Sequence, residues 1–287
     1  MASKKHLAGI IPVSGLKSDF DLPWHPSLMP LAPNYLAVER AVAECAYAGC
    51  NTIWIVCDDN ITPLIRYQIG EKIQDPVYSY RHFEINKNDA QRPIRVYYIP
   101  VAIRDINKRD NLAWSAIYGA KTAYKILKKI SAWASPDKFY ISWPYGYYKP
   151  FLIRSLRRNI SENNFMLRFN DETVKDNLYL GFTLTMEQID LLLSEVRAKS
   201  SGVWQDDDHT KRLPIEERFS YRNFDLKEVF NSINIGSYNI YDVEDYSTID
   251  CWKKYCKFLG ENEAPSKPAL LRYSEWSEIG VDEENDS

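Results

Sequence analysis

The first 60 residues constrain the fold of this chain more than any other stretch. The apolar segment Leu7–Val13 is typical of a buried strand, a helical pattern follows at Tyr35–Ala48, and a second apolar segment occupies Thr52–Cys57. Two strands joined through a helix form a βαβ unit, whose strands are parallel and lie in one sheet. Ligands of open α/β sheets bind at the carboxyl ends of the strands. We therefore expect the loop after the first strand and Asp58 after the second to form one site.

The alternation of strands and helices continues through most of the remaining chain. The next predicted strand is Ile94–Val101, and the longest amphipathic pattern, Leu112–Trp133, predicts a helix packed on the sheet. Further strands are predicted at Lys138–Ser142, Asn177–Thr183 and Ile233–Val243, and further helices at Phe151–Ile160, Thr185–Lys199 and Thr248–Leu259. This order predicts an α/β protein with three layers, α/β/α, around a mixed, mostly parallel, Rossmann-like sheet.

Polar segments interrupt and end this pattern. Glu71–Arg92 predicts an irregular excursion. Ser200–Arg218 predicts a loop or flap within one domain, because aromatic and apolar patterning resumes at Phe219. We expect residues 1–263 to form a single domain and residues 264–287, which end in a run of acidic side chains, to form a mobile tail.

Charge and cysteine content argue against several classes of protein. The net charge is −3 and the sequence pI is about 5.9, so no basic excess favours nucleic acid as a partner. No signal peptide and no apolar stretch long enough to cross a membrane is visible. The five cysteines form no Cys-x-x-Cys pair and mostly lie in apolar segments, as reduced, buried thiols do. We therefore expect a cytoplasmic protein.

Three stretches near the amino terminus resemble the sugar-nucleotide pyrophosphorylases and cytidylyltransferases. They are Ala8–Lys17 (Ala-Gly-Ile-Ile-Pro-Val-Ser-Gly-Leu-Lys), Leu28–Leu31 and Ala48–Val56. Leu112–Ala123 is similar to the helix that follows the base-binding loop of these families, and Asp245–Trp252 to their closing aspartate-rich element. The resemblance implies a fold of the nucleotide-diphospho-sugar transferase type.

The same resemblance implies a nucleotide or nucleotide sugar as ligand, and a metal-dependent transfer of a nucleotidyl group to a phosphorylated acceptor. In such a site a glycine loop brings backbone N–H groups to the phosphates, a cation neutralises them, and carboxylates hold Mg²⁺. By resemblance, Lys17 and Asp58 are assigned to catalysis, and Asp58 and Asp245 to Mg²⁺. Contacts to the nucleotide are expected from Ser14, Gly15, Leu16, Lys17 and Ser115.

The sequence departs from the family pattern at three places. The loop after the first strand holds one glycine, Gly15, where the family has two followed by a basic element. Pro26 stands where the family carries a lysine, and a proline side chain cannot donate to a phosphate. The segment Trp143-Pro144-Tyr145-Gly146 falls where the family has Gly-Asp, so the expected metal-binding carboxylate is missing there.

Each candidate residue also has a structural explanation. Lys17 can be a solvated surface lysine, and Asp58 and Asp59 can serve the turn and the cap of a following helix. The arginines of the predicted helix Phe151–Ile160 can grip a phosphate or an acidic partner, or can form a solvated helix face.

Two functions therefore stay open at this point. One is a nucleotidyltransferase-like protein that binds, and in its active form transfers, a nucleotide. The other is the same scaffold with its active site lost, which acts as a binding or assembly protein through the aromatic segment Trp143–Tyr148 and the excursion Glu71–Arg92. A glycosyltransferase is a weaker third choice, because the nearest Asp-x-Asp, Asp206-x-Asp208, comes late in the chain.

Overall fold

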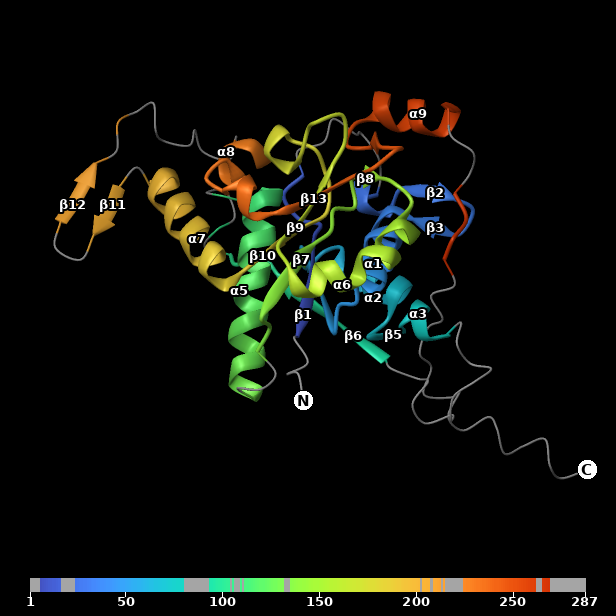
Figure 1. Ribbon diagram of the computed structural model, residues 1–287, viewed down its shortest axis with the longest axis horizontal. Helices are drawn as coiled ribbons and strands as arrows, with labels where there is room; N and C mark the ends of the chain where they lie inside the picture. The colour runs from blue at the N-terminus through green and yellow to red at the C-terminus, as the bar shows by residue number, and fades with distance from the viewer. Residues whose placement is uncertain are drawn as a thin grey trace, which may run out of the picture.

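An eight-stranded sheet runs through the centre of the molecule (Figure 1). The computed structural model describes residues 6–16, 24–79, 93–103, 105, 109, 111–131, 135–201, 203–206, 209–212, 214, 224–261 and 265–268. From edge to edge the strands are β13 (Asn239–Asp242), β9 (Phe165–Arg168), β10 (Phe182–Leu184), β7 (Lys138–Ile141), β1 (Leu7–Pro12), β4 (Thr52–Cys57), β6 (Pro93–Pro100) and β5 (Lys72–Gln74). The first strand of the chain therefore lies in the middle of the sheet.

Most neighbouring strands are parallel. β1 pairs in parallel with both β4 and β7, and β4 pairs in parallel with β6. β10 is antiparallel to both of its neighbours, β7 and β9, and β5 is an antiparallel edge strand beside β6. The predicted mixed, mostly parallel sheet is confirmed. The carboxyl ends of β1, β4, β6 and β7 consequently lie on one edge, as the βαβ argument requires.

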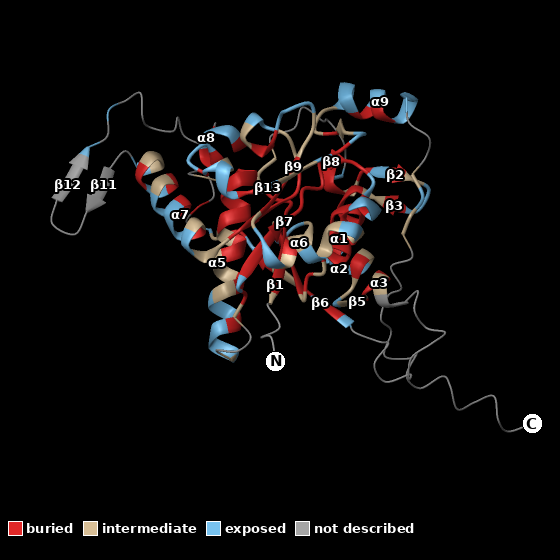
Figure 2. Ribbon diagram, in the orientation of Figure 1, coloured by how far each residue is buried: buried red, intermediate tan, exposed pale blue. Residues whose placement is uncertain are grey.

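Helices cover both faces of the sheet, because alternate side chains of a strand point to opposite faces. Ile10 and Trp54 pack in a core with α5 (Leu112–Ile130), α7 (Met186–Ser201) and α8 (Leu226–Phe230). Ile11 and Ile53 pack in a second core with α1 (Ala37–Ala48), α2 (Thr62–Ile69) and α6 (Ile153–Glu162). Figure 2 shows the buried sheet and the exposed outer faces of these helices. The predicted three-layer α/β/α arrangement is confirmed.

Several predicted boundaries differ from the structure. The helical pattern predicts Tyr35 and Leu36 as the start of a helix, but they form β3 and pair with β2 (Pro30–Ala32), so α1 begins at Ala37. The predicted strand Asn177–Thr183 is wrong over most of its length, because Asn177 adopts a left-handed conformation after the 3-10 turn η4 (Val174–Asp176). Within this range only the end, at Phe182 and Thr183, belongs to a strand, β10.

Several strands have no counterpart in the sequence prediction, among them β9 and the pair β11 (Val203–Asp206) and β12 (His209–Arg212). β9 is four residues long, and so short an apolar run carries no recognisable period. β11 and β12 form a hairpin inside the segment predicted as a loop or flap. Most of the predicted excursion, residues 80–92, lies outside the described part of the chain.

The C-terminal elements return to the βαβ unit. β14 (Ser247–Thr248) pairs with β8 (Gly146–Tyr147), and α9 (Trp252–Glu261) lies near β2 and β3 (Figure 1). Beyond α9, Lys267 Nζ donates to the carbonyl of Asn34 and to Glu39 Oε1, each at 2.7 Å. The division into a domain of residues 1–263 and a tail of residues 264–287 stays a prediction. Among the described residues, no helix is both long and apolar enough to span a membrane.

Candidate functional site

The loop after β1 and the end of β4 meet at the carboxyl edge of the sheet. The backbone N–H groups of Val13 and Ser14 both donate to the carbonyl of Val56, at 2.9 and 3.0 Å. Ser14 Oγ donates to Asp58 Oδ1 at 2.6 Å. The structure therefore brings the glycine loop and Asp58 together, as expected from the two parallel strands.

Gly15 lies directly against the start of α5. Its φ is +96°, and a Cβ at this position would lie 2.4 Å from the backbone carbon of Asn111. Only glycine combines this left-handed backbone with so close an approach. Ser115, one turn into α5, is buried and donates from Oγ to the carbonyl of Ser14 at 2.9 Å. Ser115 thus supports the loop from behind, and its predicted contact to a nucleotide stays a prediction.

A cleft of about 330 Å³ opens beside this loop. One wall consists of Gly15, Leu16 and the first residues of α5, and the other comes from three later segments of the chain. The residues that line it are Gly15, Leu16, Asn111, Leu112, Ala113, Asn177, Tyr179, Phe224, Asp225, Leu226, Asp250 and Lys254. The cleft therefore lies where open α/β sheets bind their ligands, at the carboxyl ends of the strands.

The second wall carries the charged groups of the cleft. Asp250 Oδ1 accepts an ion-pair hydrogen bond from Lys254 Nζ at 2.8 Å. Burial, together with the neighbouring charge of Asp250, raises the pKa of Tyr179, so its hydroxyl remains a neutral donor at physiological pH. Asn177 Nδ2 donates to Asp225 Oδ2 at 3.4 Å. The wall thus presents carboxylates, an amide, a phenol and one ammonium group.

Sequence reasoning did not single out this second wall. Asp250 belongs to the Asp245–Trp252 stretch that resembles the aspartate-rich element of the family, but the resemblance pointed to Asp245. Asp245 itself is exposed and does not line the cleft. Its charge lies near Tyr147, whose pKa is raised first by burial and further by Asp245. Nothing in the sequence near Tyr179 signalled its place in the wall.

The predicted site residues do not all line the cleft. Leu16 and Gly15 line the cleft, and Asp58 lies behind the loop with Ser14. Lys17 lies outside the described residues. The joint assignment of Asp58 and Asp245 to a metal stays a prediction.

The described residues show no preformed cluster of metal-binding side chains. No group of three or more His, Cys, Asp or Glu side chains that could hold a metal occurs among them. Asp58 is bound to the glycine loop, where it already accepts a hydrogen bond from Ser14. The loop after β7 contributes aromatic rings where the resemblance expects a carboxylate. No chemical step is therefore assigned to a metal.

His25 lies near Asp58, in the proline-rich passage before β2. Its Nδ1 accepts a hydrogen bond from the backbone N–H of Ser27 at 3.2 Å. Burial lowers the pKa of His25, and the charge of Asp58 opposes this shift only in part. His25 is accordingly neutral at physiological pH and supplies no positive charge beside Pro26.

The aromatic segment after β7 is part of the core. Trp143, Tyr145 and Tyr148 are fully buried, and Tyr147 is 8% exposed. Tyr145 donates from its hydroxyl to the carbonyl of Val13 at 2.7 Å, which ties this segment to the glycine loop. The prediction that Trp143–Tyr148 forms a partner surface is therefore wrong, because its rings are covered by the chain itself.

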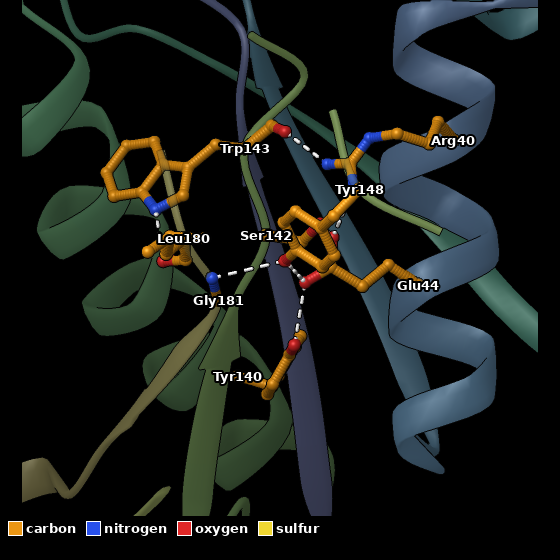
Figure 3. Close-up of polar contacts among 8 residues, drawn as sticks. All are labelled: Arg40, Glu44, Tyr140, Ser142, Trp143, Tyr148, Leu180 and Gly181. Atoms are coloured by element: carbon orange, nitrogen blue, oxygen red, sulfur yellow. Dashed lines mark hydrogen bonds and ion pairs between the residues drawn. The ribbon is translucent and has the colours of Figure 1, made fainter. Parts of the chain in front are cut away.

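A buried ion pair in α1 lies behind the aromatic segment (Figure 3). Arg40 and Glu44 are completely buried and pair at 2.8 Å. Glu44 also accepts hydrogen bonds from the hydroxyl groups of Tyr140, Ser142 and Tyr148, at 2.6, 2.7 and 2.5 Å. The carboxylate is thus fully hydrogen-bonded, which a buried charge requires.

The same network holds the backbone of the aromatic segment. Arg40 donates to the carbonyl of Trp143, and its guanidinium lies over the ring of Tyr148, 4.9 Å from the centroid (Figure 3). Burial opposes the charge of Arg40, yet Glu44 and Tyr148 keep its pKa raised. Trp143 Nε1 donates to the carbonyl of Leu180 at 3.1 Å. Contacts from α1 and from the segment before β10 therefore fix the segment on both sides.

The arginines of α6 divide into different roles. Arg157 forms two hydrogen bonds with the buried carboxylate of Asp75, at 3.1 and 2.5 Å. Arg158 is exposed and pairs with the exposed Glu162. The solvated-face explanation thus holds for Arg158, whereas Arg157 anchors the chain after β5.

Known structures share this architecture. A protein described as a glucose-1-phosphate thymidylyltransferase from Bacillus anthracis, solved with sucrose, superimposes with a TM-score of 0.52 at 8% sequence identity, covering 91% of this chain and 98% of the other. A nucleoside-diphosphate-sugar pyrophosphorylase from Vibrio cholerae RC9 superimposes with a TM-score of 0.52 at 10% identity, covering 88% and 100%. This chain has the nucleotidyltransferase-like fold. No family model and no curated protein matches the sequence.

The nucleotidyltransferase-like fold accounts for the position of the cleft. The likeness spans most of both chains. At 8 to 10% identity it establishes the fold and not the chemistry. The chemistry has to be argued from the residues of this chain.

Proposed function

We propose that this protein binds a nucleotide or nucleotide sugar in the cleft beside Gly15. The observation that carries the proposal is the position of the cleft: Gly15, Leu16 and the first turn of α5 form one wall at the carboxyl edge of a nucleotidyltransferase-like sheet. The opposite wall supplies Asp225, Asp250 and Lys254 as polar contacts. The two structural neighbours carry names of enzymes that act on nucleotide sugars or sugar phosphates, which supports the same ligand class.

Binding without nucleotidyl transfer is the form of this function that the residues favour. The segment that would carry a metal-binding carboxylate instead places Trp143 and Tyr145 in the core. Asp58 is hydrogen-bonded to Ser14. Transfer by a metal-dependent mechanism, with Lys17, Asp58 and Asp245 in the roles implied by resemblance, is the competing proposal.

Ligand-dependent stabilisation of the full chain tests the proposal. Nucleoside mono- and triphosphates and nucleotide sugars are added with and without Mg²⁺, and the melting temperature is followed. A ligand at 100 times its dissociation constant stabilises the native state by about 2.7 kcal/mol, which is a readily measured shift. If no compound at millimolar concentration shifts the melting temperature, the proposal fails.

A pair of matched substitutions then places the ligand. Leu16→Glu puts a negative charge at the lip of the cleft and is expected to weaken binding of a phosphorylated ligand. Leu64→Glu makes the same change at an exposed position of α2, outside the cleft lining, and is expected to leave affinity unchanged. Equal affinities of the two variants would place the ligand elsewhere.

A further inference from the structure

We propose that the cleft recognises its ligand through hydroxyl groups, and that this ligand is a nucleotide with a single phosphate, as in a nucleoside monophosphate. The inference rests on the proposed function, because it concerns the same cleft. The hydrogen-bond donors and charges of the described cleft limit the number of phosphates that the ligand can carry.

The backbone of the glycine loop has little capacity left for phosphate. A phosphate-binding loop needs several N–H groups that point toward the ligand. The N–H groups of Val13 and Ser14 instead both donate to the carbonyl of Val56. Ser14 Oγ donates to Asp58 and Ser115 Oγ to the carbonyl of Ser14. Among the described residues of this loop, Gly15 and Leu16 line the cleft, and two backbone N–H groups can contact one phosphate group.

The first turn of α5 is also capped from within the chain. Asn111 is the N-cap residue, and its Oδ1 accepts from the backbone N–H of Trp114 at 2.9 Å. A side-chain oxygen at this position satisfies one of the four N–H groups that could otherwise contact an anion at a helix N-terminus. One N–H group at the start of α5 is therefore already bound to Asn111 and does not contact a ligand.

Tyr145 closes the space beneath the loop. Its fully buried ring contacts Tyr179 edge-on with centroids 5.9 Å apart, and its hydroxyl holds the carbonyl of Val13 at 2.7 Å. Asp58 and Cys57, at the end of β4, are close enough to influence its ionisation. An aromatic ring thus lies among the loop after β1, the end of β4 and Tyr179 of the second wall.

The charges on the cleft wall also favour a ligand with few phosphates. Among the described lining residues, Asp225 and Asp250 are acidic and Lys254 alone is basic. A triphosphate carries several negative charges, and two carboxylates in the wall would repel it. A sugar or nucleoside instead offers hydroxyl donors, which the carboxylates of Asp225 and Asp250 accept well. Tyr179, whose hydroxyl is hydrogen-bonded to Asp250, and Asn177, whose amide pairs with Asp225 and with the backbone N–H of Lys227, line the same wall.

Calorimetric titration of the full chain tests this inference. For each of the common bases, the nucleoside, its monophosphate and its triphosphate are titrated at one ionic strength, with and without Mg²⁺. Simple hexoses and their monophosphates are included as sugar probes. We expect the best nucleoside monophosphate to bind at least tenfold more tightly than any triphosphate, with no gain from Mg²⁺.

The outcomes separate this inference from the proposed function. A triphosphate that binds as tightly as, or more tightly than, its monophosphate would overturn the inference and leave the proposed function standing. A gain in triphosphate affinity on adding Mg²⁺ would do the same. Absence of binding by every compound would overturn the inference, and the proposed function fails with it if the nucleotide sugars of the melting experiment also leave the melting temperature unchanged.

A substitution in the second wall gives an independent readout. Asp250→Asn is expected to weaken the best monophosphate ligand by about tenfold or more, since a hydrogen bond to a charged group is lost, while triphosphate affinity rises or stays the same. Asp242→Asn is the matched control, because Asp242 is exposed on β13 and pairs with Arg168 outside the cleft. If Asp250→Asn retains full affinity in a chain whose urea unfolding is unchanged, hydroxyl recognition by this wall is refuted.

Discussion

Two loops leave the same edge of the sheet, but one lines a cleft and the other is buried. The loop after β1 (Val13–Leu16) reaches a cleft through Gly15 and Leu16. The loop after β7 (Ser142–Tyr148) is buried along its whole length, although β7 is the direct parallel neighbour of β1. Topology places both loops where a ligand is expected, but only one of them lines the cleft.

Different contacts hold the two loops in place. The loop after β7 is held by the buried pair Arg40 and Glu44, which binds its backbone and two of its hydroxyl groups. The loop after β1 is held by short backbone contacts and by the left-handed Gly15. A polar network in the core thus fixes a closed loop, whereas a single glycine permits an open one. Four predictions test this contrast, in order of decreasing size of effect.

Breaking the buried ion pair is expected to have the largest effect. Glu44→Gln keeps the shape of the side chain but leaves Arg40 buried without a counter-charge, which costs about 3–5 kcal/mol in the free energy of unfolding. Urea denaturation measures this loss. Glu162→Gln, which removes the exposed partner of Arg158, should cost less than about 1 kcal/mol. Equal losses for the two variants would show that the network does not stabilise the closed loop.

Altering the open loop is expected to have the next largest effect. Gly15→Ala places a Cβ 2.4 Å from the backbone of Asn111 at a φ of +96°, so we expect a loss of about 1–3 kcal/mol in the free energy of unfolding, together with weaker ligand binding. Gly260→Ala is the control, because Gly260 lies in α9, where an added Cβ would meet no atom within 4 Å, and alanine should stabilise that helix by up to about 1 kcal/mol. A neutral Gly15→Ala would mean that the loop moves freely away from α5.

The bond that joins the two loops is expected to contribute less. Tyr145→Phe removes the hydroxyl that donates to Val13 and keeps the ring, so the free energy of unfolding should fall by about 1 kcal/mol. Tyr118→Phe, on a half-buried ring that stacks on Trp114, should change it by less than about 0.5 kcal/mol. Were Tyr145→Phe neutral while it increased triphosphate affinity, the hydroxyl would limit ligand access without stabilising the fold.

The smallest expected effect is a pH dependence from His25. Its pKa is lowered by burial from an ordinary value of 6.5, so the unfolded chain binds a proton more readily than the native chain. The contribution of His25 to stability is therefore complete above about pH 6.5 and is lost as the pH falls below it. Urea unfolding between about pH 7 and pH 5 should show a smaller decline in His25→Gln than in the wild type. Parallel declines would assign the acid sensitivity to other groups.

The architecture could be predicted from the sequence to a useful degree. The predicted β1 and β4 agree with their observed ends within one residue, and α5 begins at the predicted Leu112. These elements have long, regular apolar patterns that depend only on neighbouring residues. β9, with four residues, and the short β3 were missed, because their extended state is decided by pairing with other strands.

The candidate site was predictable only in part. Ser14 and Asp58 were expected together because they follow two strands of one βαβ unit, and the structure joins them at 2.6 Å. The second wall could not be predicted in the same way. Tyr179, Asp225 and Asp250 come from separate segments, and only the packed chain brings them to one cleft.

Three features of this protein follow from its sequence alone: the order of the parallel strands β1, β4, β6 and β7 with the long helices between them, the single glycine of the loop after β1, and the lack of a carboxylate in the segment Trp143–Gly146. Whether that aromatic segment faces solvent or the core depends instead on packing. Ser142 and Glu44 are 98 positions apart in the chain, and their hydrogen bond exists only because α1 packs over β7. Periodic patterns act over a few residues, whereas burial and charge pairing depend on contacts between distant segments. For that reason the main architecture could be predicted from the sequence, whereas the burial of the loop after β7 could not.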